Sequence, residues 1–348
     1  MAGTRLADRL ADMDDRYSRQ VLFSGIGADG QASLASATAL VVGCGALGTV
    51  ISTILVRAGV GTVKIVDRDF IEFHNLQRQV LFDEEDVRAR LPKAVAAQRH
   101  LQKVNSAIKV EGIVADVNYS NVEDFVRTAD VVLDGLDNLE ARLLINDSCL
   151  KHNVPWVYGG AIASDGVTMT VVPGKTACFR CAFPSPAARG MALTCDTAGV
   201  IAPAPFVIGS LQATQALKIL VGSGDVGGRI TAVDVWEGFF HNIKIDRRPD
   251  CPACNGRWEF LESRFGTRSA SLCGQNAVQV MDPSRTSFSL EQLAGQLKAL
   301  GETDYNGYML TFLADGYEMV VFPDGRAIVR GTSDQTIARS LYSKYIGS

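Results

Sequence analysis

A glycine-rich segment between a predicted strand and a predicted helix most constrains the fold of this chain. Residues 38–42 are apolar and largely β-branched, and they run directly into Gly43-Cys-Gly-Ala-Leu-Gly48. Apolar residues at helical spacing follow until Gly59, and a second apolar run then ends in Asp67. This order is typical of a nucleotide-binding unit, in which the helix amino terminus binds phosphate and the acid binds ribose hydroxyls.

The three glycines of this loop have a physical role in such a unit. Gly43, Gly45 and Gly48 permit a tight turn and a close approach of phosphate to backbone N–H groups. The same pattern also occurs as a structural turn without a ligand, and it does not distinguish ATP from a dinucleotide.

Strand and helix signals continue to alternate along the chain. Further strands are indicated at residues 109–117, 131–133 and 155–158, with a helix at 139–152. This predicts an α/β fold with a Rossmann-like, doubly wound, mainly parallel sheet covered on both faces. From Gly166 onward longer β segments, at 167–172 and 229–235, extend the sheet, with a helix at 206–221 between them.

Composition shifts divide the chain into four predicted parts. We expect an N-terminal arm (1–15), a nucleotide-binding domain (16–262), a linker rich in Ser, Arg, Thr, Gly and Pro (263–288), and a small α+β C-terminal domain (289–348). In the last part a helix at 289–300 precedes a hairpin with the turn Asp315-Gly316, a strand at 327–329 and a helix at 335–345.

Charge and hydropathy exclude several partners. The 348 residues carry 34 Lys and Arg against 38 Asp and Glu, so no basic surplus indicates nucleic acid. Residues 1–15 lack the apolar run of a secretory signal. The apolar stretch 198–221 contains two prolines and polar residues at helical spacing, which indicates a buried helix. We therefore expect a cytoplasmic protein with no membrane or nucleic-acid partner.

Acids and cations follow the glycine loop in an order that suits phosphate chemistry. They are Asp67-Arg-Asp69, Asn75-Leu-Gln-Arg78-Gln79, Pro92-Lys93 and Asp134-Gly-Leu-Asp137-Asn138. Phosphoryl or nucleotidyl transfer needs cations on the leaving pyrophosphate and an acid for Mg²⁺, whereas hydride transfer does not. A nicotinamide-dependent oxidoreductase with a structural zinc, and a non-catalytic scaffold with this fold, remain the alternatives.

Four of the eight cysteines form two CxxC pairs, Cys178–Cys181 and Cys251–Cys254. Two such pairs in a chain without a secretory signal indicate a metal site in a reducing compartment. Four thiolates suit tetrahedral zinc and leave no open position for catalysis, so we expect a structural site. The remaining cysteines, including Cys195, are isolated in the sequence.

These motifs together resemble the ubiquitin-activating-enzyme superfamily, in particular its prokaryotic-type ThiF/MoeB/HesA-like adenylyltransferases. The resemblance covers residues 16 to 261. It rests on the motifs above, on Arg16-Tyr-Ser-Arg19-Gln20, and on Thr194-Cys195 followed by Ala198-Gly-Val200. It implies that the chain binds ATP and Mg²⁺ and adenylates the terminal carboxylate of a ubiquitin-like sulfur carrier (ThiS/MoaD-like) ending in Gly-Gly. Pyrophosphate is released, and the product serves thiamine or molybdopterin synthesis.

The resemblance also implies roles for individual residues. Asp67 would bind ribose, Asn75, Arg78 and Lys93 the phosphates, and Asp137 the magnesium ion. Asp69 and Asn138 belong to the same nucleotide-binding motifs. Arg19 resembles an arginine finger that is supplied to the active site of the other subunit, which implies a homodimer.

Sulfur chemistry is the least determined part of the resemblance. In parts of the family the cysteine matching Cys195 carries a thioester or a persulfide, and a buried inert thiol is an equal alternative. The C-terminal segment has no rhodanese-like active-site loop, so sulfur would come from a separate donor such as a cysteine desulfurase. That segment either docks a partner, supports the dimer or simply packs on the main domain.

Overall fold

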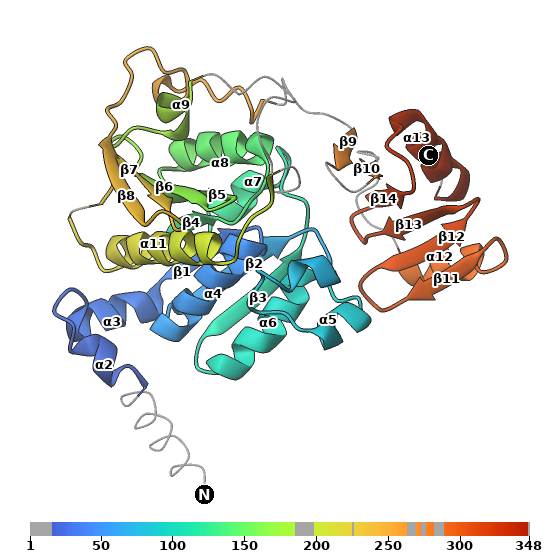
Figure 1. Ribbon diagram of the computed structural model, residues 1–348, viewed down its shortest axis with the longest axis horizontal. Helices are drawn as coiled ribbons and strands as arrows, with labels where there is room; N and C mark the ends of the chain where they lie inside the picture. Colours follow the sequence, from blue (N-terminus) through green and yellow to red (C-terminus); the bar gives the residue numbers. More distant parts are fainter. Residues whose placement is uncertain are drawn as a thin grey trace, which may run out of the picture. The chain divides into compact units, whose positions relative to one another are not determined.

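The chain folds into two compact units, Met1–Arg264 and Phe265–Ser348 (Figure 1). The computed structural model describes residues 16–184, 198–224, 226–262, 269–272, 276–281 and 289–346. The expected N-terminal arm, residues 1–15, and Cys195 lie outside these ranges.

An eight-stranded sheet forms the centre of the first unit, in the order β3-β2-β1-β4-β5-β6-β7-β8. The five parallel strands are β1 (Thr38–Val42), β2 (Thr62–Asp67), β3 (Lys109–Val114), β4 (Val131–Asp134) and β5 (Trp156–Ile162). The antiparallel extension consists of β6 (Asp165–Val171), β7 (Arg229–Asp234) and β8 (Phe239–Lys244). The mainly parallel sheet with a β extension agrees with the sequence prediction.

Helices cover both faces of this sheet (Figure 1). On one face lie α4 (Ala46–Ala58), α6 (Lys93–Val104) and α11 (Pro203–Leu220), and on the other lie α7 (Val122–Val126) and α8 (Leu139–His152). All four residues of β4 are buried, as expected for a central strand covered on both sides. The short elements are α2 (Ser18–Val21), α3 (Gly27–Ser36), η1 (Phe73–Asn75), α5 (Glu84–Arg88), α9 (Phe179–Ala182) and η2 (Ala253–Asn255).

The ends of α4 and α8 follow from single residues. Gly59 ends α4 in the left-handed region, with φ +82°, where a side chain would be strained. Asn138 caps α8, its side-chain oxygen accepting the Ala141 N–H at 2.8 Å. The caps therefore fix where each helix begins or ends relative to the strand edge.

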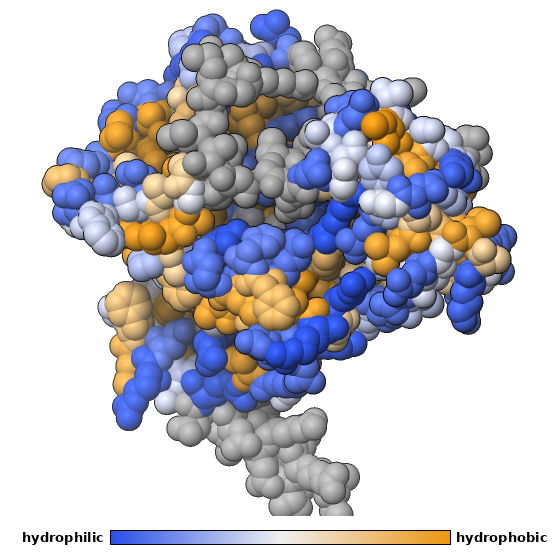
Figure 2. Space-filling view, turned by 45° about the vertical axis from the view of Figure 1, so that its right-hand side comes forward, coloured by the Kyte–Doolittle hydropathy of each residue, from blue (hydrophilic) through white to orange (hydrophobic). Residues whose placement is uncertain are grey.

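No helix in the described part of the chain is long and apolar enough to cross a membrane. On the face drawn in Figure 2, apolar residues form several separate patches bordered by hydrophilic residues. The large apolar side chains that are most exposed include Leu22 and Phe23 beside α2, and Trp236, Phe239 and Phe240 around the β7–β8 turn.

The second unit is a six-stranded antiparallel sheet in the order β11-β12-β13-β14-β10-β9, with two helices. The strands are β9 (Ser269–Leu272), β10 (Ala277–Val280), β11 (Glu302–Tyr305), β12 (Leu310–Ala314), β13 (Tyr317–Val321) and β14 (Ala327–Arg330). The helices are α12 (Leu290–Leu297) and α13 (Gln335–Tyr345). As expected, β12 and β13 form a hairpin, and its turn residues Asp315 and Gly316 have φ of 53° and 79°.

The segment 263–288 differs from the linker that the sequence predicts. It contains β9 and β10, and β10 pairs with β14 as well as with β9. Each strand has only four residues, and β10 joins the sheet by pairing with the distant strand β14, which a scan of local composition does not detect. The compact unit accordingly begins before residue 289.

Candidate nucleotide site and cysteine cluster

Gly43, Gly48 and Gly135 pack tightly against one another where β1 and β4 end. A Cβ atom on Gly48 would lie 1.9 Å from the Gly43 carbonyl oxygen, and one on Gly43 would lie 2.5 Å from the Gly135 carbonyl oxygen. Gly45 is different, because the nearest heavy atoms to its Cβ position are 3.9 Å away. Gly43 and Gly48 are therefore required for packing, while a Cβ atom on Gly45 would make only ordinary contacts. Gly45 lies at the amino terminus of α4, where backbone N–H groups favour an anion.

Asp67 ends β2 and joins it to this loop. Its two carboxylate oxygens accept hydrogen bonds from the Cys44 N–H at 2.6 Å and the Asp69 N–H at 2.7 Å. Burial raises the pKa of Asp67, and the Lys93 ammonium and these two donors oppose that rise. The carboxylate thus holds the glycine loop and the segment after β2 together.

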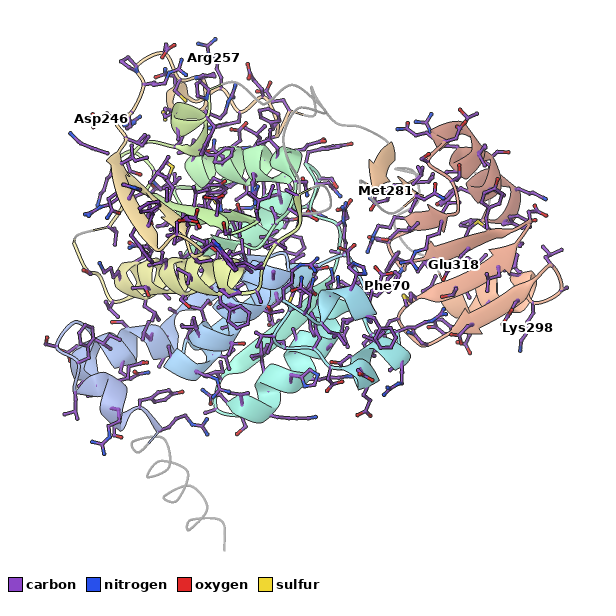
Figure 3. The ribbon with its side chains drawn as sticks, in the orientation of Figure 1. Phe70, Asp246, Arg257, Met281, Lys298 and Glu318 are labelled. Carbon is purple, nitrogen blue, oxygen red and sulfur yellow. The ribbon has the colours of Figure 1, made fainter. Side chains whose placement is uncertain are left out.

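Lys93 is the first residue of α6 and is only 7% exposed. Its Nζ lies 3.3 Å from Asp69 Oδ2, and its backbone N–H donates to the Asp69 carbonyl oxygen. The segment between them begins at Phe70, labelled in Figure 3, and ends at Pro92, and these two residues pair in an isolated β-bridge. Although burial acts to lower it, the pKa of Lys93 is raised by Asp69, Asp67 and Asp137, so the ammonium stays charged.

Arg68 is a member of this cluster that the sequence reasoning did not include among the site residues. Its guanidinium pairs with Asp116 at 3.1 Å and lies 3.8 Å from Asp69. Burial acts to lower the pKa of Arg68, but Asp116, Asp69 and Asp137 raise it. The signal in the sequence is a lone arginine between two acids at the end of a buried strand.

Asp137 and Asn138 lie in the loop after β4. Asp137 is exposed and follows Gly135 by two residues, and Gly135 packs directly against Gly43 of the glycine loop. The charge of Asp137 acts to raise the pKa values of Lys93 and Arg68. The Asn138 side chain caps α8, so its structural role here is to begin that helix. The carboxyl ends of β1, β2 and β4 therefore bring together Asp67, Asp69, Lys93 and Asp137, as parallel strands do at a ligand site.

The segment from Asn75 to Gln79 lies beside the glycine loop. Asn75 is buried and its side-chain oxygen accepts the Glu72 N–H at 3.0 Å, while Arg78 donates to the His74 carbonyl oxygen at 2.9 Å. Gln79 is buried, and its Nε2 is among the atoms nearest to the Gly45 Cβ position. Asn75 thus shapes the turn, and Arg78, half-buried, is held by its own segment.

Arg19 lies near the carboxyl end of α4, opposite the end at which the glycine loop stands. It is exposed on α2, and the neighbouring Gln20 side chain donates to the carbonyl oxygen of Ala58, at the end of α4. The 13 residues of α4 separate this point from the glycine loop, a span of about 20 Å. An arginine side chain is too short to cover that distance within one chain.

The two CxxC pairs meet in space. The Sγ atoms of Cys178 and Cys251, and of Cys181 and Cys254, are 3.6 Å apart, those of Cys178 and Cys181 are 3.8 Å apart, and all four lie within 4.8 Å of one another. Tetrahedral zinc with Zn–S bonds of about 2.3 Å requires sulfurs about 3.8 Å apart. The cluster therefore has the geometry that fits a four-thiolate zinc site.

Neighbouring groups prepare this cluster for a cation. The Arg248 N–H donates to Cys181 Sγ at 3.4 Å. A hydrogen bond from Cys178 lowers the pKa of Cys254 to about 5, and the same contact raises that of Cys178. In Figure 3 the labelled residues Asp246 and Arg257, which precede and follow the second pair, lie at the end of the unit that carries α9.

The fold and the site together define the class of protein. The sheet is Rossmann-like, a glycine loop stands at a helix amino terminus, and buried Lys93 and partly buried Arg68 pair with acids, an arrangement typical of α/β nucleotide-binding units. Residues 17–253 match the ThiF family. The chain belongs to the ThiF family.

Relatives agree with this assignment. The chain is 42% identical over 339 residues to the sulfur carrier protein ThiS adenylyltransferase of Bacillus subtilis, covering 96% of this chain and 100% of that one. It is 38% identical over 246 residues to a sulfur carrier protein adenylyltransferase of Thermus thermophilus, covering 69% and 90%. A solved structure of Escherichia coli MccB with ATP superposes with a TM-score of 0.61 at 28% identity, covering 69% of this chain and 74% of MccB.

Proposed function

We propose that this protein uses ATP to adenylate the C-terminal glycine carboxylate of a ubiquitin-like sulfur carrier (ThiS/MoaD-like), releasing pyrophosphate. The product serves sulfur transfer in thiamine or molybdopterin synthesis. The observation that carries the proposal is the ion-paired cluster of buried Lys93 with the partly exposed Asp69 and Arg68, together with the glycine loop at the start of α4. The names of the relatives, both sulfur-carrier adenylyltransferases, support the choice of substrate.

The reaction requires little acid–base catalysis from the protein. A carboxylate oxygen of the carrier forms a bond to the α-phosphorus of ATP, the bond from that phosphorus to the bridging oxygen breaks, and pyrophosphate leaves with the electron pair. The nucleophile is already an anion, so no general base is needed. What it needs is screening from the triphosphate, which fixed cations supply.

Residues of this chain would supply that screening and orient the nucleotide. Lys93, held charged by its acids, and Arg78 would contact the phosphates, with Asn75 shaping the turn between β2 and α5. The backbone N–H groups around Gly45 would bind phosphate oxygens. Asp67, already bonded to the loop through Cys44, would accept from the ribose hydroxyls with its remaining lone pairs.

The residues present could bind two metal ions. Asp137, exposed beside Lys93 and Arg68, would hold Mg²⁺, which when bound neutralises triphosphate charge. Cys178, Cys181, Cys251 and Cys254 would hold a structural Zn²⁺ that ties the segment after β6 to the segment after β8.

The proposed active form is a homodimer in which Arg19 enters the site of the partner. Arg19 is exposed about 20 Å from its own glycine loop. The exposed side chains of Leu22 and Phe23 adjoin it, and an apolar groove between α11 and β8, lined by Phe206, Leu211 and Phe240, offers surface for a second copy. This surface suits association because exposed apolar side chains gain from burial.

Sulfur transfer follows adenylation in the proposed function. Cys195 would carry the activated carboxylate as a thioester or a sulfur atom as a persulfide, or serve only as a buried thiol. A separate donor such as a cysteine desulfurase would supply the sulfur.

Exchange of labelled pyrophosphate into ATP tests the proposed function. Exchange that requires a carrier ending in Gly-Gly, and stops when the terminal glycine is removed, is the expected result. Reduction of a nicotinamide cofactor, followed by absorbance, without any carrier-dependent exchange would instead favour the oxidoreductase that shares the glycine loop and Asp67.

A further inference from the structure

Arg142, on the first turns of α8, is bonded to the loop that carries Asp137. Its Nε donates to Asp134 Oδ2 at 3.1 Å and its Nη2 donates to the Leu136 carbonyl oxygen at 2.6 Å. The other oxygen of Asp134 accepts the Leu136 N–H at 2.8 Å. Asp134 is fully buried and the Arg142 side chain is 15% exposed. The residue just before Asp137 is thus fixed through both its N–H and its carbonyl group.

The Arg142 guanidinium also contacts an aromatic cluster. Its Nη2 also donates to the Gly159 carbonyl oxygen at 3.0 Å, and its guanidinium carbon lies 5.2 Å from the centre of the Tyr158 ring. The Tyr158 ring packs edge-on against Phe179 at 4.9 Å. Tyr158 and Phe179 are 6% and 3% exposed, so this stack is interior packing.

Phe179 belongs to the cysteine cluster, because it follows Cys178 directly and begins α9. Its N–H donates to Asn146 Oδ1 at 2.9 Å, and Asn146 lies on α8, one turn beyond Arg142. The next residue, Asp147, accepts the Phe260 N–H from the segment after the second cysteine pair. The cysteine cluster is therefore fastened to α8, the helix that carries Arg142.

We propose that Arg142 is a positioning residue for the Asp137 loop, and that the Cys178–Cys181 pair holds Arg142 in place through Phe179 and Tyr158. The cysteine cluster then influences cation binding at the nucleotide site through packing rather than by touching substrate. This inference rests on the proposed function, since it assigns a reason for the exact setting of Asp137. Positioning groups of this kind typically change metal affinity by about tenfold or more when altered.

Two pairs of variants in the full-length protein test this inference. Arg142→Lys keeps the charge but loses the forked donors, and Arg180→Lys is its matched control. Arg180 is 16% exposed and pairs with Glu259 at 2.8 Å, at the cysteine cluster but away from the Asp137 loop. Tyr158→Leu removes the ring under the guanidinium, while Tyr158→Phe keeps it. The readout is Mn²⁺ binding in the presence of a non-hydrolysable ATP analogue, with the thermal midpoint measured in parallel.

Arg142→Lys and Tyr158→Leu should weaken Mn²⁺ binding by about tenfold, whereas Arg180→Lys and Tyr158→Phe should leave it unchanged. In carrier-dependent exchange, Arg142→Lys and Tyr158→Leu should raise the half-saturating Mg²⁺ concentration by a similar factor. If Arg142→Lys does not fold, the Tyr158 pair decides. Wild-type Mn²⁺ affinity in Arg142→Lys, or equal affinities in Tyr158→Leu and Tyr158→Phe, would overturn the inference.

A chelator separates the two halves of the proposal. Removing the metal from the cysteine cluster and dialysing away the chelator should weaken Mn²⁺ binding in the wild type. The same treatment should weaken it little further in Arg142→Lys, because metal removal and the substitution both act through Arg142. Equal effects in both proteins would show that the cluster does not act through Arg142. A wild type without carrier-dependent exchange contradicts the proposed function instead, and the Mn²⁺ comparison still decides the positioning role.

Discussion

Gly45 and Gly48 meet opposite requirements within a single turn. A methyl group on Gly48 would collide with the Gly43 carbonyl oxygen, whereas one on Gly45 would meet nothing closer than 3.9 Å. Gly48→Ala should therefore lower the free energy of unfolding by about 1–3 kcal/mol. Gly45→Ala should leave stability within about 0.5 kcal/mol but weaken ATP binding by about tenfold or more, because the methyl group fills the space for phosphate.

Chemical denaturation and ATP titration of both variants check this contrast. Each variant serves as the control for the other. Wild-type ATP affinity in a folded Gly45→Ala protein would remove the glycine loop from the nucleotide site.

Local sequence explains some site residues and not others. Asp67 and Lys93 are predictable because each occupies a fixed place, at a strand end or a helix start. Arg68 and Arg142 are not, because their roles depend on partners from other segments: Asp116 for Arg68, and Leu136 and Gly159 for Arg142. A buried arginine has no periodic signature, so only the fold shows what it holds.

At the scale of elements, a helix with clear end signals is predicted well, whereas short strands are not. The helix predicted at 139–152 has the observed bounds of α8, because Asn138 caps its start and Asn153, in the left-handed conformation, ends it. The strands β9, β10 and β11 were not predicted. Each has only four residues, too few for a clear local pattern, and β10 pairs with the distant strand β14 as well as with its neighbour β9.

The cysteine cluster joins elements that are far apart in the chain, so its metal should be countable and stabilising. We expect about one zinc per chain by elemental analysis. Cys251→Ser should lose the metal and at least about 2 kcal/mol of stability, because the knuckles would then be held only by packing. Cys149→Ala, which removes a fully buried thiol outside the cluster, should keep the zinc. Protein purified without chelator and free of metal would contradict the zinc assignment.

At the scale of the whole molecule, the position of Arg19 predicts complementation between subunits. Arg19→Ala and Lys93→Gln proteins should each be nearly inactive alone. Mixed after dissociation, they should regain about a quarter of the wild-type exchange rate per subunit, since half the dimers are mixed and each has one complete site.

Arg16→Ala is the control for that experiment, because Arg16 lies in the same segment and bonds the Val104 carbonyl oxygen instead. The Arg16→Ala protein should be active alone, without mixing with a second variant. Mixed dimers that form but stay inactive would show that Arg19 does not cross the interface.

The two units have separate apolar cores, so the second should be dispensable for nucleotide chemistry. Among the described residues, its core lies at positions 278–346, and every proposed ATP contact lies in the first unit. A protein ending at residue 264 should bind ATP and catalyse exchange at saturating carrier. If the second unit docks the carrier, the half-saturating carrier concentration should rise. A folded, dimeric truncated protein that cannot bind ATP would contradict this separation.

The proposed reaction leaves a covalent product whose mass can be measured directly. A carrier ending in Gly-Gly, incubated with ATP, Mg²⁺ and this protein, should gain the mass of an adenylyl group at its C-terminus. The adduct should be absent with Asp137→Ala, because the carboxylate proposed to hold Mg²⁺ is lost. Adduct formation that is unchanged in Asp137→Ala would contradict the role of that residue. A wild-type protein that leaves every such carrier at its original mass would contradict adenylation itself.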